Sequence, residues 1–181
     1  MRVFIAVFPP SEVQRTAERA TQTLKGVRDA VSWVRADNLH YTMRFLGEQD
    51  DAAVERAKLA MTKAAAAQPR FGAALGGFGA FPTAKKARVL WVGMLQGAEP
   101  MRLLATALDH ELHAQRFERA DDAFEPHLTL GRVRTPSDWT ARLIDAQMPE
   151  ARFQVDRLWL VNSTLGAGGS RYEKLVEVPL A

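Results

Sequence analysis

The chain has 181 residues, of which 47% are apolar, enough for one sizeable hydrophobic core and too few for two ordinary independent domains. It contains no cysteine, which excludes disulfides, thiolate metal sites and cysteine nucleophiles and favours a reducing cytoplasm. The net charge of +3 allows a polyanionic partner but is well below that of a dedicated nucleic-acid-binding protein. The apolar run VFIAVF is too short to span a membrane, so we expect a single cytoplasmic domain over residues 1–181 with no membrane partner.

Periodicity and turn residues predict strands and helices that do not alternate regularly. In chain order we expect a strand at 2–8, a helix from 11 to about 28, strands at 31–34 and 39–46, a helix from about 50 to 67, strands at 70–81 and 88–95, a helix at 99–115, a strand at 127–133, a short helix at 137–147, and strands at 152–163 and 171–180. Ser11 and Gln14 form a plausible capping box for the first helix. This order fits an α+β fold with helices packed on antiparallel sheets.

One short pattern occurs twice. NLHYTMRFLG places His40 two residues before Thr42, and PHLTLGR places His127 two residues before Thr129, 87 residues further on. Threonine occupies only 11 of the 181 positions, so the coincidence is improbable. The repeat suggests a pseudo-symmetric duplication in which each half contributes one copy to a shared central cleft.

Strand geometry indicates what this pattern can do. Side chains two apart on a strand point to the same face, so each histidine projects together with its threonine. Two facing pairs offer two imidazoles that exchange protons near neutral pH and two hydroxyls that donate to anionic oxygens. A phosphodiester fits this set, because one imidazole can activate water while the other protonates the leaving oxygen.

Other interpretations of the histidines remain. A single His-x-Thr segment is often an ordinary structural pair with the histidine bonded to backbone. A zinc site would need three protein ligands, and two histidines without a placed carboxylate leave that set incomplete. His110 and His113 do not form the His-Glu-x-x-His pattern of metalloproteases, so we expect them on a solvated helix surface. We therefore expect no cofactor and no metal.

The two segments also resemble a known family. LHYTMRFLGE and PHLTLGRV are similar to the paired signature of the 2H phosphoesterases, and more narrowly of the bacterial and archaeal RNA 2',3'-cyclic phosphodiesterases, also called 2'-5' RNA ligases. RVFIAVFPP, GGFGAFPTAKKARVLWVG and LWLVNSTLGAGGSRYEKL extend the resemblance over nearly the whole chain. It implies a bilobal, pseudo-symmetric fold in which two antiparallel sheets with outer helices surround a central cleft between the lobes. It also implies metal-independent hydrolysis of an RNA or nucleoside 2',3'-cyclic phosphate to a 2'-phosphate.

The resemblance assigns roles to individual residues. The family's catalytic histidines fall on His40, as proton donor, and His127, as proton acceptor, and its phosphate-holding threonines on Thr42 and Thr129. The residues alone do not separate donor from acceptor, because the two motifs are nearly symmetric.

Three further residues are candidates for substrate binding. Phe45 and Arg132 match positions where relatives bring an aromatic ring and an arginine near the nucleobase, with the core as the alternative for Phe45. Ideal alternation turns both away from their histidines, so a bend at Gly131 or at the strand end is needed. Arg44 shares the face of His40 in an ideal strand and is a phosphate candidate, with a surface ion pair as its alternative.

Two other functions stay open. ATP-independent 2'-5' RNA ligation runs the same proton transfers in reverse, with an RNA 5'-hydroxyl in place of water. A non-catalytic module could use the cleft only to bind RNA ends. In each case the expected partner is an RNA or nucleotide, with a 2',3'-cyclic phosphate end as the substrate for hydrolysis, and the expected state is a monomer.

Overall fold

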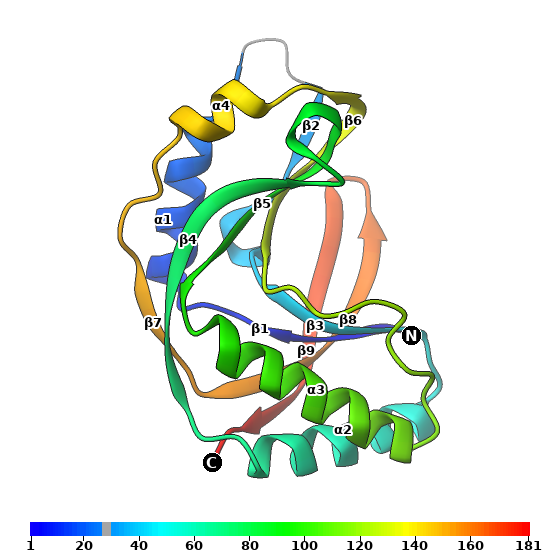
Figure 1. Cartoon of the computed structure of the whole chain (residues 1–181). Helices are drawn as coiled ribbons and strands as arrows, with labels where there is room; N and C mark the ends of the chain where they lie inside the picture. Colours follow the sequence, from blue (N-terminus) through cyan, green and yellow to red (C-terminus); the bar gives the residue numbers. More distant parts are fainter. Residues whose placement is uncertain (27–29) are drawn as a thin grey trace.

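The computed structural model describes residues 1–26 and 30–181 and confirms the α+β class (Figure 1). Its elements are β1 (Arg2–Val7), α1 (Ser11–Gln22), β2 (Val31–Trp33), the 3-10 turn η1 (Ala36–Asn38), β3 (Tyr41–Glu48), α2 (Asp51–Ala66), β4 (Phe71–Phe81), the 3-10 turn η2 (Ala84–Lys86), β5 (Ala87–Gln96), α3 (Ala98–Ala114), β6 (Leu128–Ser137), α4 (Thr140–Asp145), β7 (Arg152–Val155), β8 (Arg157–Gly166) and β9 (Gly169–Pro179). In this part of the chain no helix is both long enough and apolar enough to cross a bilayer.

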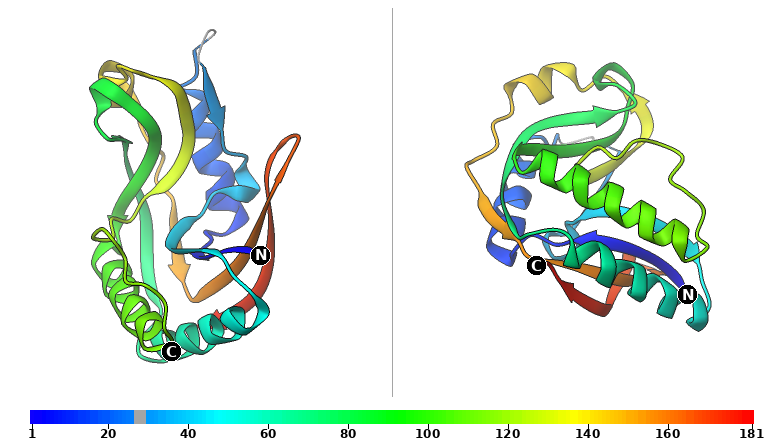
Figure 2. Two further views of the ribbon diagram at one scale, coloured as in Figure 1. Left: turned by 90° about the vertical axis from the view of Figure 1, so that its right-hand side faces the viewer. Right: turned by 60° about the horizontal axis from the view of Figure 1, so that its bottom comes forward.

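The strands form one curled antiparallel sheet, where the sequence predicted two. The order is β7-β4-β5-β6-β3-β1-β8-β9, with β2 paired to β6 beside this path. The sheet has two arms, one made of β7, β4, β5 and β6 and the other of β3, β1, β8 and β9. They are joined between β6 and β3 by one matched pair, Tyr41 opposite Leu128. The β8–β9 hairpin projects from the end of the sheet (Figure 2). The two expected sheets are therefore the two arms of a single sheet.

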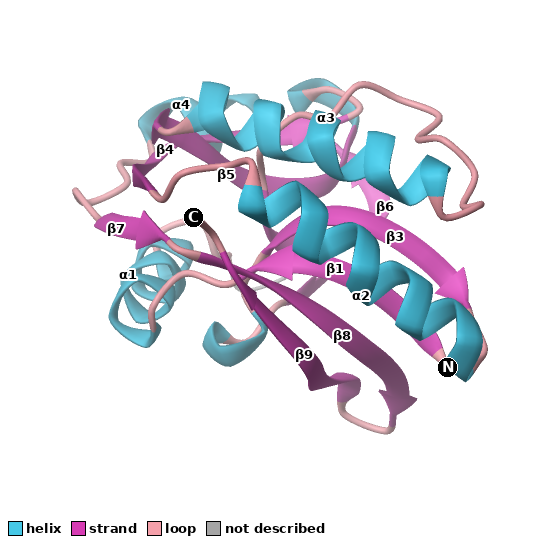
Figure 3. Ribbon diagram, turned by 90° about the horizontal axis from the view of Figure 1, so that it is seen from below, coloured by secondary structure: helices cyan, strands magenta, loops and turns pink. Residues whose placement is uncertain are grey.

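The two faces of the sheet have different neighbours. Helices α2 and α3 lie side by side across one face (Figure 3), where the main hydrophobic core also contains alternate β1 residues such as Ile5. Phe4 and Ala6 belong instead to a second small cluster with Val161, against which Tyr172 packs. Strand β1 is thus buried on both sides, and the side opposite the two helices borders His40.

The start of α1 differs from the predicted capping box. Pro10 is the N-cap residue, and no side chain caps the helix. Gln14 is buried, and its Nε2 donates to the carbonyl of Leu39 at 2.8 Å, the residue before His40. The helix ends at Gln22, so the expected extension toward Arg28 is not observed, and Arg28 itself lies outside the described residues. The side chain predicted to cap the helix therefore ties it to the His40 segment.

Candidate active site

The two His-x-Thr segments meet where the arms of the sheet join. Tyr41 pairs with Leu128, and in an antiparallel ladder the flanking positions are also neighbours, so Thr42 lies beside His127 and His40 beside Thr129. Tyr41 and Leu128 are fully buried in the main core, whereas the four flanking residues are only partly buried. The histidines and threonines therefore share the face opposite the core.

Both histidines are held by the same backbone contact. Nδ1 of His40 lies 2.7 Å from the carbonyl oxygen of Asn38, and Nδ1 of His127 lies 2.8 Å from that of Glu125. A carbonyl only accepts hydrogen bonds, so each Nδ1 carries the proton in the neutral ring. This tautomer leaves each Nε2 to accept a proton when the ring is neutral and to donate one when it is charged.

The two Nε2 atoms differ in their partners. Nε2 of His40 lies 3.0 Å from Oγ1 of Thr42, whose hydroxyl donates to it in the neutral ring. Nε2 of His127 has no hydrogen-bond partner within residues 1–26 and 30–181. The matched motifs are therefore alike at Nδ1 and unlike at Nε2.

The pKa of His40 is lowered from 6.5 to about 4, chiefly because the imidazole is buried. The hydrogen bond to the Asn38 carbonyl raises this pKa in part, and the nearby charge of His127 lowers it. The free protein therefore holds His40 neutral at pH 7. A phosphate anion beside the ring would favour the charged form and raise this pKa.

Aromatic rings form the wall behind His40. The ring centroids of Phe4, Phe8 and Tyr172 lie 4.9, 5.2 and 5.3 Å from that of His40, with Tyr172 edge-on. These rings explain the burial of the imidazole. Tyr172 belongs to the segment LWLVNSTLGAGGSRYEKL that carries the family resemblance, but the resemblance did not indicate its contact with His40. Phe8 carried no signal in the sequence, because it precedes the motif by a whole helix.

His127 has its own aromatic neighbours. The Phe81 ring lies edge-on at 5.0 Å and the Trp91 ring at 6.4 Å. Trp91 also lies over Gly79, where an added Cβ would come within 2.2 Å of the indole. Each histidine is therefore oriented by a carbonyl on one side and by rings on another.

A β-bulge follows each motif at the same distance from its histidine. Ala6 pairs with Thr42 and Ile5 with Arg44, so Met43 is the extra residue in β3. Trp91 pairs with Thr129 and Leu90 with Gly131, so Leu130 is the extra residue in β6. A bulge reverses the alternation of the side chains that follow it. The bend predicted at Gly131 is thus a bulge at Leu130, one residue earlier, and a matching bulge lies at Met43 in the other arm.

The bulges explain where the predicted binding residues lie. Phe45 and Arg132 both line a cavity of about 250 Å³ together with His40, Thr42 and Thr129. His127 is not among the lining residues and lies beside Thr42 at the edge of this cavity. Phe45 is 64% exposed, so it is not a core residue.

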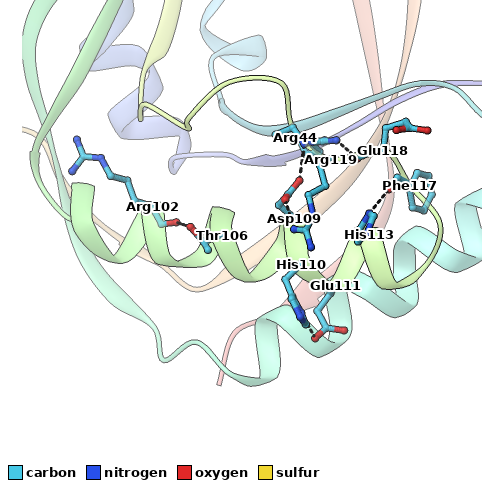
Figure 4. A network of polar contacts seen from close by, with 11 residues as sticks. Arg44, Arg102, Thr106, Asp109, His110, Glu111, His113, Phe117, Glu118 and Arg119 are labelled. Atoms are coloured by element: carbon cyan, nitrogen blue, oxygen red, sulfur yellow. Dashed lines mark hydrogen bonds and ion pairs between the residues drawn. The ribbon is translucent and has the colours of Figure 1, made fainter.

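Arg44 lies elsewhere, contrary to its expected position beside His40. Its guanidinium pairs with Asp109 of α3 at 2.9 Å and also donates to the carbonyl of Glu118 (Figure 4). Partial burial opposes ionisation of Asp109, but hydrogen bonds from Ala120 and Arg119 and the charge of Arg44 lower its pKa. Arg44 therefore has an ionised partner outside the histidine cavity.

The cavity also contains residues that the sequence did not indicate. One wall comes from β2 and the residues after it, including Trp33, and the other from the glycine-rich tip of the β8–β9 hairpin. The Asn38 amide donates to the carbonyl of Ser170 at 3.0 Å and so ties that tip to the His40 segment. The LGAGGS turn was visible in the sequence, but its distant partner was not. Among the described residues, no group of three or more His, Cys, Asp or Glu side chains is placed to hold a metal ion.

Comparison with known proteins places this chain in a family. The model of the 2'-5' RNA ligase superfamily matches residues 9–167. An RNA 2',3'-cyclic phosphodiesterase of Thermotoga maritima is 31% identical over 178 residues, covering 98% of this chain and 94% of that protein. One of Escherichia coli K12 is 32% identical over 176 residues, covering 96% of this chain and 93% of that protein.

Solved structures agree with this placement. The protein TT0787 of Thermus thermophilus superposes with a TM-score of 0.81 at 28% identity, over 99% of this chain and 98% of the other. Escherichia coli LigT complexed with 3'-AMP superposes with a TM-score of 0.80 at 26% identity, over 99% and 98%. The chain therefore belongs to the 2'-5' RNA ligase superfamily, the 2H phosphoesterase family that its paired His-x-Thr segments indicated.

Proposed function

We propose that this protein is an RNA 2',3'-cyclic phosphodiesterase that converts a terminal 2',3'-cyclic phosphate to a 2'-phosphate and a free 3'-hydroxyl without a metal ion. The observation that carries the proposal is the matched anchoring of the two histidines by backbone carbonyls at 2.7 and 2.8 Å. This anchoring directs one protonatable Nε2 from each arm toward the same face. The names of the relatives from Thermotoga maritima and Escherichia coli support the reaction, and the LigT complex with 3'-AMP supports a nucleotide ligand.

The proposed reaction uses one histidine at each end of an in-line displacement. Nε2 of His127 removes a proton from water as the water oxygen bonds to phosphorus. The bond from phosphorus to O3' breaks, and O3' takes the proton from Nε2 of His40. One turnover therefore leaves His127 charged and His40 neutral, and the two must exchange protons with solvent before the next.

The low pKa of His40 has a role in this scheme. A histidine that is neutral at pH 7 in the free protein gains its proton only when an anion arrives. The cyclic phosphate carries one negative charge and so supplies that condition. The His40 cation formed in the complex then donates its Nε2 proton to O3', a poor leaving group that needs a proton as its bond to phosphorus breaks.

The threonines and the bulged residues are proposed to hold the substrate. Thr42 and Thr129 donate their hydroxyls to the non-bridging phosphate oxygens, where charge is concentrated during the displacement. When phosphate enters, the Thr42 hydroxyl turns from His40 toward the anion. Phe45 and Arg132, which line the same cavity, contact the nucleobase by stacking and by cation contact.

The test uses metal-stripped protein in EDTA with an RNA ending in a 2',3'-cyclic phosphate, the product being identified by phosphorus NMR. The expected product is the 2'-phosphate. A 3'-phosphate would contradict the assignment of the leaving oxygen. If the substrate stays unchanged in EDTA and is converted once metal is added back, metal independence is contradicted. If the protein binds the RNA but does not convert it, with or without metal, the RNA-end binding module is favoured.

A further inference from the structure

A second cavity of about 220 Å³ shares one lining residue, Phe45, with the histidine cavity. Its other lining residues include Arg44, Arg56, Arg116, Phe117 and Glu118. These come from β3, from α2 and from the segment that follows α3. Three arginines thus line this space, and among the described residues Glu118 is the only acidic residue that lines it.

The positive charge of this second cavity is only partly neutralised. Arg44 is paired with Asp109. Arg56 contacts uncharged groups, since its Nε donates to the carbonyl of Gln115 at 3.2 Å and its guanidinium lies over the Phe117 ring at 5.7 Å. Arg116 has no acidic partner within residues 1–26 and 30–181. The cavity therefore has unused capacity for an anion.

The backbone of Arg116 points to the same conclusion. It follows Gln115, the C-cap of α3, and has φ +68, the left-handed conformation in which helices commonly end on glycine. A residue with a Cβ in that conformation costs about 1 kcal/mol or more relative to glycine. An arginine therefore occupies a position whose backbone favours glycine, and this residue lines the cationic cavity.

Phe45 links the two cavities in a way that suits a single nucleic-acid strand. It is a large, mostly exposed aromatic residue that lines both the cavity proposed to hold the terminal phosphate and the cavity lined by arginines. Proteins that bind single strands combine aromatic stacking platforms with cationic groups along the backbone. A free inorganic anion or an acidic peptide would not need the aromatic link.

We propose that the Arg56–Arg116 cavity binds the phosphodiester that precedes the terminal cyclic phosphate, so that the enzyme favours oligonucleotides over mononucleotides. This inference rests on the proposed function, because it requires the cyclic phosphate to occupy the histidine cavity. It predicts that the preference for a longer substrate is set by residues that do not touch the reacting phosphate.

The experiment compares adenosine 2',3'-cyclic phosphate with the dinucleotide ApA bearing a terminal 2',3'-cyclic phosphate. Arg116→Gly and Arg56→Gln are the test variants, and Arg15→Gln is the control, because Arg15 is an exposed arginine of α1. We expect wild type to have the higher kcat/KM on the dinucleotide. Each test variant should lose about tenfold on the dinucleotide, as expected for one charged contact, with the mononucleotide unaffected. The glycine variant relieves the left-handed strain, so thermal unfolding should show no loss of stability.

Salt gives a second readout. Displacement of counterions from a single strand makes log K fall with log salt by about 0.7 per neutralised phosphate, so Arg116→Gly should flatten the salt dependence for the dinucleotide. An unchanged dinucleotide-to-mononucleotide ratio in both test variants, relative to Arg15→Gln, would overturn the inference. So would a wild type with no preference.

Failure of the proposed function would look different. If wild type turned over neither substrate, calorimetric titration of the dinucleotide into His127→Ala, with and without Arg116→Gly, would decide the inference alone. About tenfold weaker binding in the double variant would support it, and equal binding would refute it.

Discussion

Tyr41 lies directly opposite Leu128 at the single matched pair between β3 and β6, and each of these two residues is flanked by a histidine and a threonine. One pairing therefore does two things. It joins the arms of the sheet through two fully buried side chains on one face, and it brings both imidazoles together on the other. Because side chains alternate between the two faces of a strand, the core residues Tyr41 and Leu128 point one way and the flanking histidines and threonines point the other.

Removal of either imidazole is expected to abolish most turnover. His40→Ala and His127→Ala should each lower kcat for a 2',3'-cyclic phosphate by roughly 10²- to 10⁴-fold, because each removes one proton transfer. The wild-type rate should follow a bell-shaped pH profile with apparent pKa values that belong to the coupled pair. Circular dichroism and thermal unfolding check that the fold is intact. Full activity in both variants would refute the mechanism.

The low pKa of His40 predicts a specific loss of stability in acid. The unfolded chain binds a proton at His40 with a pKa near 6.5, whereas the folded chain does so only near 4. The contribution of His40 to the free energy of unfolding is therefore fully present above pH 6.5. It is lost as the pH falls from 6.5 to 4, and it does not change further below pH 4. The total is on the order of 3 kcal/mol.

His40→Asn removes this titrating group and serves as the comparison. The difference in unfolding free energy between wild type and variant, from urea titrations at pH 7.5, 5.5 and 4, should shift in favour of the variant as the pH falls. Parallel curves across this range would show that His40 titrates normally. An NMR titration of the imidazole nitrogens gives the pKa directly and should move upward when phosphate is added.

The buried hydroxyl of Tyr41 is expected to cost stability. It has no hydrogen-bond partner within the described part of the chain, and burial raises its pKa. Tyr41→Phe keeps the ring contacts, including the stacking on Phe153 at 6.3 Å, while removing the unsatisfied group. The free energy of unfolding should rise by about 1–2 kcal/mol. A fall of similar size would show that the hydroxyl is hydrogen-bonded in solution.

A methyl group at Gly79 is expected to disturb His127 through Trp91. The added Cβ would lie 2.2 Å from the indole, which must move, and the indole packs near His127 and Phe81. Gly79→Ala should lose about 1–3 kcal/mol of stability and also lower kcat. Gly77→Ala is the matched control in the same strand, because nothing lies within 4 Å of its added Cβ. Equal effects of the two substitutions would contradict the proposed route through Trp91.

Local sequence determined the chemical groups of the candidate site. The repeated His-x-Thr spacing on strand-like segments was enough to predict His40, Thr42, His127 and Thr129 as a set, because a strand turns residues two apart to one face whatever lies around it. The α+β class followed in the same way from the order of local periodicities. Both depend on interactions within a few residues of the chain.

Tertiary structure decided everything that depends on distant segments. The bulges at Met43 and Leu130, set by pairing with β1 and β5, bring Phe45 and Arg132 into the cavity, while Asp109 holds Arg44 outside it. A bulge is a mismatch between two strands and cannot be found in either alone. Pairing through Tyr41 and Leu128 likewise merged the two predicted sheets into one, because a ladder between residues so far apart in sequence leaves no local signal.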